Sequence, residues 1–223
     1  MKRALIVGTL CLSGLVLSGC SSKVVEPEQY SGFLRDYSRL TENTSPSGAT
    51  VMRWVDPDLK VGRYTSVYIE PSQFYPKPQA TERIPQSTLQ GITRYYDAAL
   101  KREISKSMPL ATGPGPGTIV VRPAITAVSS KTEGLKPYEV IPIALVAAAV
   151  STASGIRDQE TEIATEAAFL DGGNNKVLAQ VVRKGSGKPL ENEKQVLVPG
   201  DVKVVLDAWA SDLNLSFQKL KSH

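Results

Sequence analysis

Apolar residues recur at helical spacing in two long segments of the chain. Over residues 87–107 they lie three or four positions apart and form a single stripe: Leu89, Ile92, Tyr96, Ala99, Leu100 and Ile104. Residues 201–220 repeat the pattern: Val202, Val205, Leu206, Trp209, Leu213, Phe217 and Leu220. Each segment is therefore predicted to be an amphipathic helix. A shorter stripe of Phe33, Tyr37 and Leu40 predicts a third, short helix over residues 30–40.

Four further segments have the composition and alternation of β-strands: residues 64–70, 118–128, 158–170 and 176–184. The last two flank a strong turn sequence at 171–175 and are predicted to form a hairpin. The order of elements is strand, helix, strand, apolar segment, hairpin and helix. This order predicts an α+β fold, with a mostly antiparallel sheet of four or five strands and two amphipathic helices on one face.

Three glutamates share one face of the strand predicted at 158–170: Glu160, Glu162 and Glu166. Paired carboxylates could serve a hydrolase of the glycosidase type. An alternating charged face is also typical of a sheet surface in contact with solvent, and we favour this interpretation. We therefore expect these side chains to be solvated.

The apolar segment at 140–150 contains no polar side chain. It is too short to span a membrane, which requires about 20 apolar residues. Because it is apolar all round, it needs cover on more than one side. The interpretations considered are a crossover helix buried in the fold, an interface between copies, and contact with a membrane. We favour burial, with a weak homo-oligomer formed through Val140, Leu145 and Ala148.

The first twenty residues have the layout of a secretory signal, because Lys2 and Arg3 precede an apolar run over residues 4–17. The run ends in Leu17-Ser18-Gly19-Cys20, which resembles the lipobox of bacterial lipoproteins. The resemblance implies cleavage before Cys20 and acylation of its thiol and its new amino group. The predicted organisation is a signal peptide over 1–19, a lipidated tether over 20–29 and a single periplasmic α+β domain over 30–223.

The residue after the lipidated cysteine helps to determine in which membrane the lipoprotein finally resides. In the sorting rules of Gram-negative lipoproteins, an aspartate at this position favours the inner membrane, and this chain has Ser21 there instead. The expected location is therefore the periplasmic face of the outer membrane.

The charge of the chain argues against binding of nucleic acid. The formal net charge is only +4, and two of the cations, Lys2 and Arg3, leave with the signal peptide. Electrostatic binding of nucleic acid would require a clustered basic face. The nearest approach to such a face is interspersed with glutamates and is predicted to be a solvated hairpin: Arg183, Lys184, Lys188 and Lys194.

Cysteine and histidine are nearly absent, which narrows the possible chemistry. The two cysteines, Cys11 and Cys20, both lie in the signal region, so no disulfide is expected in the domain. The single histidine is His223. Zinc sites, Ser-His-Asp triads and Cys-His dyads all need a positioned imidazole or thiolate. We therefore predict no metal, no cofactor and no catalytic residue of these classes.

Two segments of the chain resemble a known family. The first is GFLRDYSRL at 32–40, and the second is WVDPDL at 54–59. With the lipobox upstream and a strand that ends in Pro71, they resemble a family of uncharacterised proteobacterial lipoproteins, a domain of unknown function. The resemblance covers the whole mature chain. It implies a lipoprotein and does not indicate an activity.

Together these features predict an outer-membrane-anchored lipoprotein that acts as a non-enzymatic interaction or assembly module of the cell envelope. Its expected partners are the membrane, through acylated Cys20, and an envelope protein or further copies of the chain. The alternative is a periplasmic binder of a small apolar or lipid ligand, with residues 140–150 lining the pocket. An apolar cavity in the structure would favour this alternative. A carboxylate-based hydrolase is the third function considered.

The lipobox interpretation predicts that Cys20→Ala abolishes acylation, because only a thiol at this position can accept the diacylglyceryl group. The wild-type protein should label with a palmitate analogue in cells and fractionate with membranes. Substitution of Cys11 by alanine is the matched control and should leave labelling unchanged. Lipid labelling that persists in the Cys20→Ala protein would contradict the interpretation.

Overall fold

The computed structural model describes residues 24–131, 160–191 and 195–221. Cys20 and the segment at 140–150 lie outside the described residues. The predictions of lipid attachment at Cys20 and of contacts through Val140, Leu145 and Ala148 therefore stay predictions.

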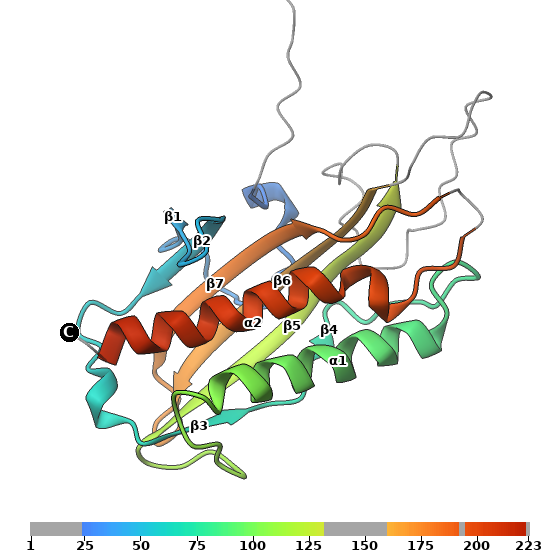
Figure 1. Cartoon of the computed structure of the whole chain (residues 1–223). Coiled ribbons are helices and arrows are strands. Elements are labelled where there is room, and N and C mark those ends of the chain that lie inside the picture. Colours follow the sequence, from blue (N-terminus) through green and yellow to red (C-terminus); the bar gives the residue numbers. More distant parts are fainter. Residues whose placement is uncertain (1–23, 132–159, 192–194, 222–223) are drawn as a thin grey trace, which may run out of the picture.

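A mixed sheet forms the middle of the described part of the chain (Figure 1). Its seven strands are β1 (Thr41–Thr44), β2 (Thr50–Val55), β3 (Ser66–Ile69), β4 (Gln73–Phe74), β5 (Thr118–Lys131), β6 (Glu160–Asp171) and β7 (Val177–Ser186). Their order across the sheet is β1-β2-β7-β6-β5-β3, and β4 also pairs with β5. Strands β3 and β4 run parallel to β5, and the other pairs are antiparallel.

The predicted α+β class is confirmed, although the described sheet has seven strands where four or five were expected. The strands that the pattern did not predict are β1, β2 and β4. Strand β1 is a polar Thr-Glu-Asn-Thr segment that is mostly exposed, and β4 has only two residues. Neither is long enough to carry an alternation, so both depend on their pairing with a neighbouring strand.

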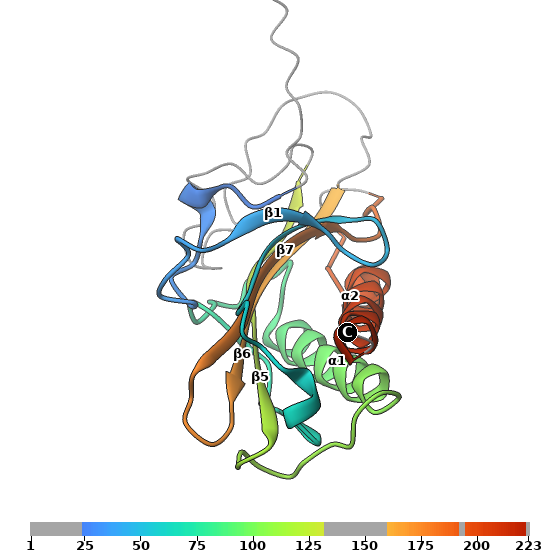
Figure 2. The ribbon, with the colours of Figure 1, turned by 90° about the vertical axis from the view of Figure 1, so that its left-hand side faces the viewer.

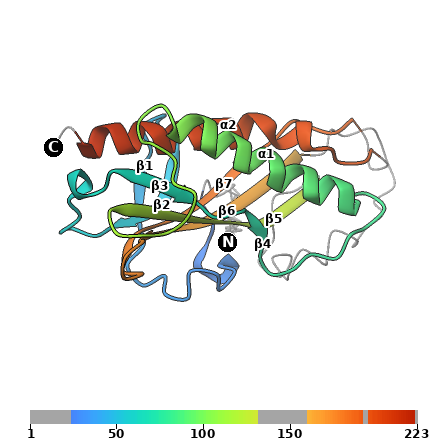
Figure 3. The same ribbon diagram turned by 90° about the horizontal axis from the view of Figure 1, so that it is seen from below.

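The two predicted helices lie side by side on one face of the sheet (Figure 1 and Figure 3). They are α1 (Gln86–Ile104) and α2 (Pro199–Lys221). The whole predicted apolar stripe of α1 is buried. The stripe of α2 is buried as far as Phe217, apart from Leu213, which is half-buried, and its last residue, Leu220, is exposed. Two short 3-10 turns complete the elements: η1 (Pro27–Gln29) and η2 (Val61–Arg63).

Glycines allow the first half of α2 to approach the sheet closely. A Cβ atom at Gly187 would collide with the carbonyl oxygen of Asp201, and one at Gly185 would lie 2.8 Å from Val205 Cγ1. Both contacts are closer than side chains allow, so glycine is needed at these two positions of the β7 end. Gly185 in β7 and Gly187 just after it therefore allow the first half of α2 to lie close to the sheet.

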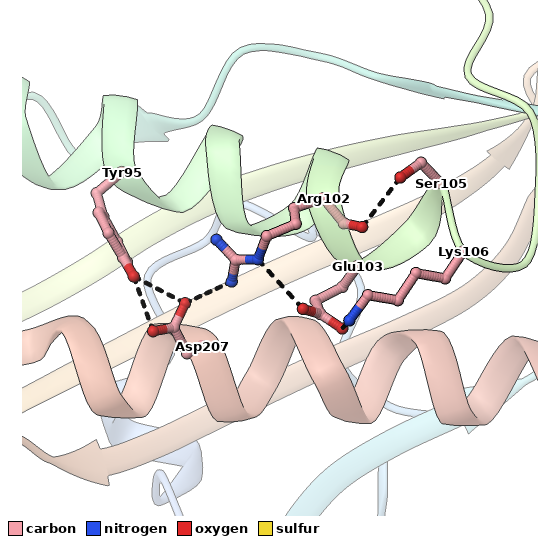
Figure 4. Close-up of polar contacts among 6 residues, drawn as sticks. All are labelled: Tyr95, Arg102, Glu103, Ser105, Lys106 and Asp207. Atoms are coloured by element: carbon pink, nitrogen blue, oxygen red, sulfur yellow. Dashed lines mark hydrogen bonds and ion pairs between the residues drawn. The ribbon is translucent and has the colours of Figure 1, made fainter.

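A polar network joins the exposed edges of the two helices (Figure 4). Tyr95 Oη donates a hydrogen bond to the Asp207 carboxylate, with Oδ2 at 2.7 Å, and Arg102 Nη2 lies 2.7 Å from Asp207 Oδ1. Arg102 also contacts Glu103, whose other oxygen lies 2.6 Å from Lys106 Nζ. Burial alone would raise the pKa of Asp207, but the hydrogen bonds from Tyr95 and Arg102 outweigh it and lower the pKa. The network fixes α1 and α2 to each other on their outer side.

The N-terminal segment covers the opposite face of the sheet. Figure 2 shows the helices on one side of the strands and this segment, in blue, on the other. Val25, Leu34 and Leu40 are buried there against β5, β6 and β7. Val25 and Gln29, which the sequence analysis placed in the tether, are thus buried parts of the domain. Both faces of the central strands are covered.

The prediction of a helix over residues 30–40 is wrong. This segment forms turns, because Gly32 and Arg35 both take positive φ angles, of 89° and 65°, which a right-handed helix does not allow. Tyr37 stabilises the turns, since its Oη accepts hydrogen bonds from the backbone N–H groups of Gly32 (2.8 Å) and Leu34 (3.2 Å). The apolar positions are buried as expected, but by a different backbone.

The prediction that the glutamates of this strand face solvent is also wrong for the two whose side chains are described. Glu162 is 4% exposed and Glu166 is 1% exposed, because the N-terminal segment covers the face of β6 on which they lie. Glu166 Oε1 accepts a hydrogen bond from the Ser31 N–H (2.9 Å) and Oε2 one from Tyr37 Oη (2.6 Å). Glu162 pairs with Lys184 at 3.2 Å.

The basic hairpin is not a solvated cluster. The Arg183 side chain is 12% exposed and lies 2.7 Å from Asp212 of α2, while Lys184 pairs with Glu162 on the opposite face. Lys188 is exposed as predicted, and Lys194 lies outside the described residues. Successive residues of β7 point to opposite faces, and here each charged side chain meets a carboxylate on its own face.

The buried position of Glu166 predicts that Glu166→Gln destabilises the fold. Tyr37 Oη already accepts two backbone hydrogen bonds, so its single hydrogen must go to residue 166. A glutamine at this position has one oxygen and one NH2 group in place of two oxygens. If the NH2 group faces Ser31, two N–H donors point at each other, and if it faces Tyr37, the Tyr37 hydroxyl hydrogen has no acceptor. In either orientation a buried donor loses its acceptor. We expect a loss of about 1–3 kcal/mol in the free energy of unfolding, measured by thermal melting.

Glu42→Gln is the matched control, because Glu42 is exposed on β1. The free energy of unfolding of this variant should lie within about 0.5 kcal/mol of the wild-type value. Equal melting of all three proteins would show that the contacts of Glu166 do not contribute to stability.

Candidate functional site

A cavity of about 390 Å³ lies between the sheet and the second half of α2. Its apolar lining comes from both layers and from η2: Val55, Leu59, Val61, Leu100, Ile119, Val121, Ala167, Phe169, Leu178, Ala179, Val181, Trp209, Leu213, Phe217 and Leu220. Cavities for small molecules in proteins measure about 300–1,000 Å³ and are lined mainly by such side chains. The cavity is therefore of a size and chemistry suited to an apolar guest.

The position of the cavity follows from how α2 rests on the sheet. The first half of the helix is held close at Gly185 and Gly187, while the lining residues of α2 begin at Trp209. Beneath the second half, two positions of the sheet carry only alanine, Ala167 and Ala179. Small side chains under the helix leave a space that the surrounding residues do not fill.

The cavity opens at one end of the molecule. Most lining residues are buried or half-buried, and the exposed ones are Thr44, Pro46, Lys219 and Leu220. Thr44 and Pro46 lie where β1 turns into β2, and the other two lie in the last turn of α2. These segments occupy the same end of the domain (Figure 1 and Figure 3). The opening therefore lies between the β1–β2 turn and the C-terminal end of α2.

Asp212 joins the three elements around this opening. Its Oδ2 lies 2.7 Å from Arg183 Nη1 of β7 and 3.0 Å from Ser47 Oγ, and its Oδ1 accepts a hydrogen bond from the Ser47 N–H at 2.9 Å. Burial alone would raise the pKa of Asp212, but the hydrogen bonds from Arg183 and Ser47 outweigh it, so the pKa lies below its usual value. The carboxylate is charged at neutral pH and holds α2, β7 and the β1–β2 turn together.

The charged groups of the cavity are all cationic. Among the described lining residues these are Arg53, Arg183 and Lys219, and no lining residue carries a carboxylate. Arg183 is neutralised by Asp212. Arg53 donates a hydrogen bond to Asn43 Oδ1 at 3.4 Å. Hydroxyl groups of Ser45, Thr165 and Ser216 complete the polar part of the lining.

The candidate site residues predicted from the sequence do not line this cavity. Glu162 and Glu166 point to the opposite face of the sheet, and Cys20 lies outside the described residues. Within the described ranges, no group of three or more His, Cys, Asp or Glu side chains could hold a metal ion. The helices of these ranges all fall short of the length or hydropathy needed to cross a membrane.

The lowered pKa of Asp212 predicts a stability that depends on pH. Its pKa in the folded state lies below the value of about 3.9 typical of an unfolded chain. Above that value the charged carboxylate therefore makes its full contribution to the stability of the fold. This contribution is lost as the pH falls through the pKa of the folded state. Asp212→Asn should lower the melting temperature at pH 7, and the difference from the wild type should shrink between pH 4 and pH 2.5.

Asp58→Asn serves as the control because Asp58 is exposed. It should melt like the wild type at both pH values. A deficit of the Asp212→Asn protein that is as large at pH 2.5 as at pH 7 would contradict the role given to the charge.

Comparisons with known proteins agree with the sequence pattern. A family model described as a protein of unknown function, DUF3313, matches residues 29–213. The chain is also 40% identical over 209 residues to the uncharacterized lipoprotein YdcL of Escherichia coli strain K12, and the match covers 94% of each chain. YdcL of Escherichia coli O157:H7 gives the same identity and coverage.

Two solved structures are similar at low sequence identity. Protein XCC0632 from Xanthomonas campestris has a TM-score of 0.43 and 12% identity, with 82% of this chain and 96% of that chain covered. The PelC dodecamer from Paraburkholderia phytofirmans has a TM-score of 0.38 and 11% identity, with 74% and 98% covered. The family match and the relatives at 40% identity show that the chain belongs to the DUF3313 family and is a lipoprotein anchored to a membrane of the cell envelope.

Proposed function

We propose that this lipoprotein is a non-enzymatic binding module of the outer membrane, which takes an apolar or amphiphilic molecule into the cavity beneath α2. The observation that carries the proposal is the cavity itself. It has a volume of about 390 Å³, an apolar lining from both layers of the fold and an opening at one end. An apolar cavity is the feature that was expected to favour ligand binding over an assembly role.

The position of the anchor supports a lipid-related ligand. Val25 is buried in the domain and lies five residues after Cys20. Five extended residues reach about 18 Å at most. With Cys20 acylated, the domain stays beside the bilayer, where apolar molecules are concentrated. Ser21, in place of an aspartate, supports the outer membrane as its location.

The chemistry of the described residues supports binding without catalysis. The cavity lining carries no carboxylate that could act as a general acid or base. Glu162 and Glu166, the remaining candidates for a hydrolase, are buried on the other face and are bonded to Lys184, Ser31 and Tyr37. Their contacts give them a structural role.

An interaction module of the envelope is the second candidate, and a smaller observation favours it. Three valines are exposed close together in the sequence: Val196 and Val198 just before α2, and Val204 within it. Val204 is 76% exposed. Exposed apolar side chains are a feature of contact sites when they adjoin one another. These valines belong to the opposite end of α2 from the opening of the cavity, so both functions could coexist in one domain.

Photolabelling of the full lipoprotein in phosphatidylcholine vesicles tests the binding proposal. The probe is a neutral long-chain alcohol that carries a photoreactive diazirine in its chain. We expect labelled peptides to come from β2, β7 and the second half of α2. Ala179→Leu should reduce this labelling about tenfold, because the added carbons occupy the cavity.

The matched control is Ala208→Leu, which adds the same carbons to an exposed position of α2. Its labelling should equal that of the wild type, and circular dichroism should show that both variants are folded. The proposal fails if the probe labels only residues outside the cavity, or if Ala179→Leu labels as strongly as the control.

A further inference from the structure

The charges around the cavity identify the kind of molecule that it would hold, if the proposed binding function is correct. The three charged residues of the described lining are cations, and they come from three separate elements: Arg53 of β2, Arg183 of β7 and Lys219 of α2. Arg183 is paired with Asp212 at 2.7 Å. The charge of Arg183 is thereby neutralised and adds no net positive charge to the cavity.

Arg53 differs from three other half-buried basic side chains, Arg122, Arg183 and Lys184. Each of these has a carboxylate partner within 3.2 Å, in the pairs Arg122–Glu70, Arg183–Asp212 and Lys184–Glu162. Half-buried Arg53 donates only to the neutral Asn43 side chain at 3.4 Å, and no ion pair links it to a carboxylate of the described residues. Its guanidinium can thus still accept an anionic partner, for which arginine geometry is well suited.

Arg53 lines the cavity from β2. It lies three residues after Thr50, which pairs with Thr44 beside the β1–β2 turn at the open end. Lys219 lines the cavity from the last turn of α2. The sheet contributes apolar residues to the same lining, among them Leu178, Phe169 and Ile119. The cavity therefore combines a cationic side chain on β2 with an apolar interior.

We propose that the ligand is an amphiphile with an anionic head group, which binds at Arg53, and with one hydrocarbon chain that fills the cavity. The volume of about 390 Å³ limits the chain. This volume lies toward the lower end of the range of about 300–1,000 Å³ for small-molecule cavities, so the cavity has room for one chain. This fits a single acyl chain, either free or as one chain of an anionic phospholipid.

The test uses the full lipoprotein in phosphatidylcholine vesicles and three diazirine probes of equal chain length. Their head groups are a sulfonate, a hydroxyl and a trimethylammonium. In the wild type, we expect labelling of the cavity peptides by the sulfonate to exceed that by the ammonium about tenfold, at equal probe content of the vesicles. Arg53→Gln should remove most of this preference. Arg53→Lys, which keeps the charge, should retain it in part.

Arg94→Gln is the matched control, because Arg94 is exposed on α1 and does not line the cavity. It should label like the wild type with all three probes. A diazirine phosphatidylglycerol probe, compared with the single-chain sulfonate, distinguishes a phospholipid from a free single-chain amphiphile.

The possible failures are distinct. If the alcohol labels the cavity but the sulfonate has no advantage in the wild type, the inferred head group is wrong and the binding function stands. If Arg53→Gln keeps the full preference for the sulfonate, Arg53 is not the recognition residue. If no probe labels the cavity in the wild type, the proposed function itself fails.

Discussion

The ion pair between Asp212 and Arg183 is the interaction on which the arrangement around the cavity depends. Removing both charges from water is costly, and such a pair is favourable only when its remaining hydrogen-bonding groups are satisfied. Ser47 supplies these bonds from the β1–β2 turn, through its N–H and its hydroxyl. One buried carboxylate thereby fixes the distance between a helix, a central strand and a turn. Hydrocarbon contacts are not directional and would not hold these three parts at a set spacing.

The two faces of the sheet are covered in different ways. On the helix face, glycines bring α2 close at one end, and small side chains leave space at the other. On the opposite face, the N-terminal segment follows the strands closely, and Tyr37, Glu166 and Gln180 satisfy its turns by hydrogen bonds. The first face is therefore partly hollow, and the second is covered by hydrogen-bonded turns. This asymmetry is why the cavity, and not the glutamate face, is the candidate site.

Sequence patterns predicted the elements that are long and amphipathic. Helices α1 and α2 and the β6–β7 hairpin each carry a repeated apolar stripe or a strong turn, so local pattern and tertiary structure agree. Residues 30–40 also have a helical stripe, but the positive φ angles of Gly32 and Arg35 belong to a chain that follows a sheet. Glu162 and Glu166 alternate like solvated residues, and only the unpredicted second layer makes them buried. Alternation shows that two faces differ and does not show what covers each.

The cavity was not predictable from the sequence. Its lining residues come from segments spread between Thr44 and Leu220, and within each segment they read as ordinary core positions. What creates the space is the small side-chain volume at Ala167 and Ala179, beneath the half of α2 that lies beyond its close contacts with Gly185 and Gly187. These are properties of packing between distant segments. Arg53 likewise belongs to no sequence motif. What distinguishes it is that no carboxylate of the described residues forms an ion pair with it.

The strand order has a consequence for how an exported chain of this kind acquires its fold. Strands β1 and β2 come early in the sequence, but β2 pairs with β7, which is more than a hundred residues later. The face that covers Val25 is likewise built by β5, β6 and β7. A chain that emerges from its N-terminus first has no surface on which to bury Val25 until β5, β6 and β7 have followed. Burial of the N-terminal segment therefore waits for strands that come far later in the sequence.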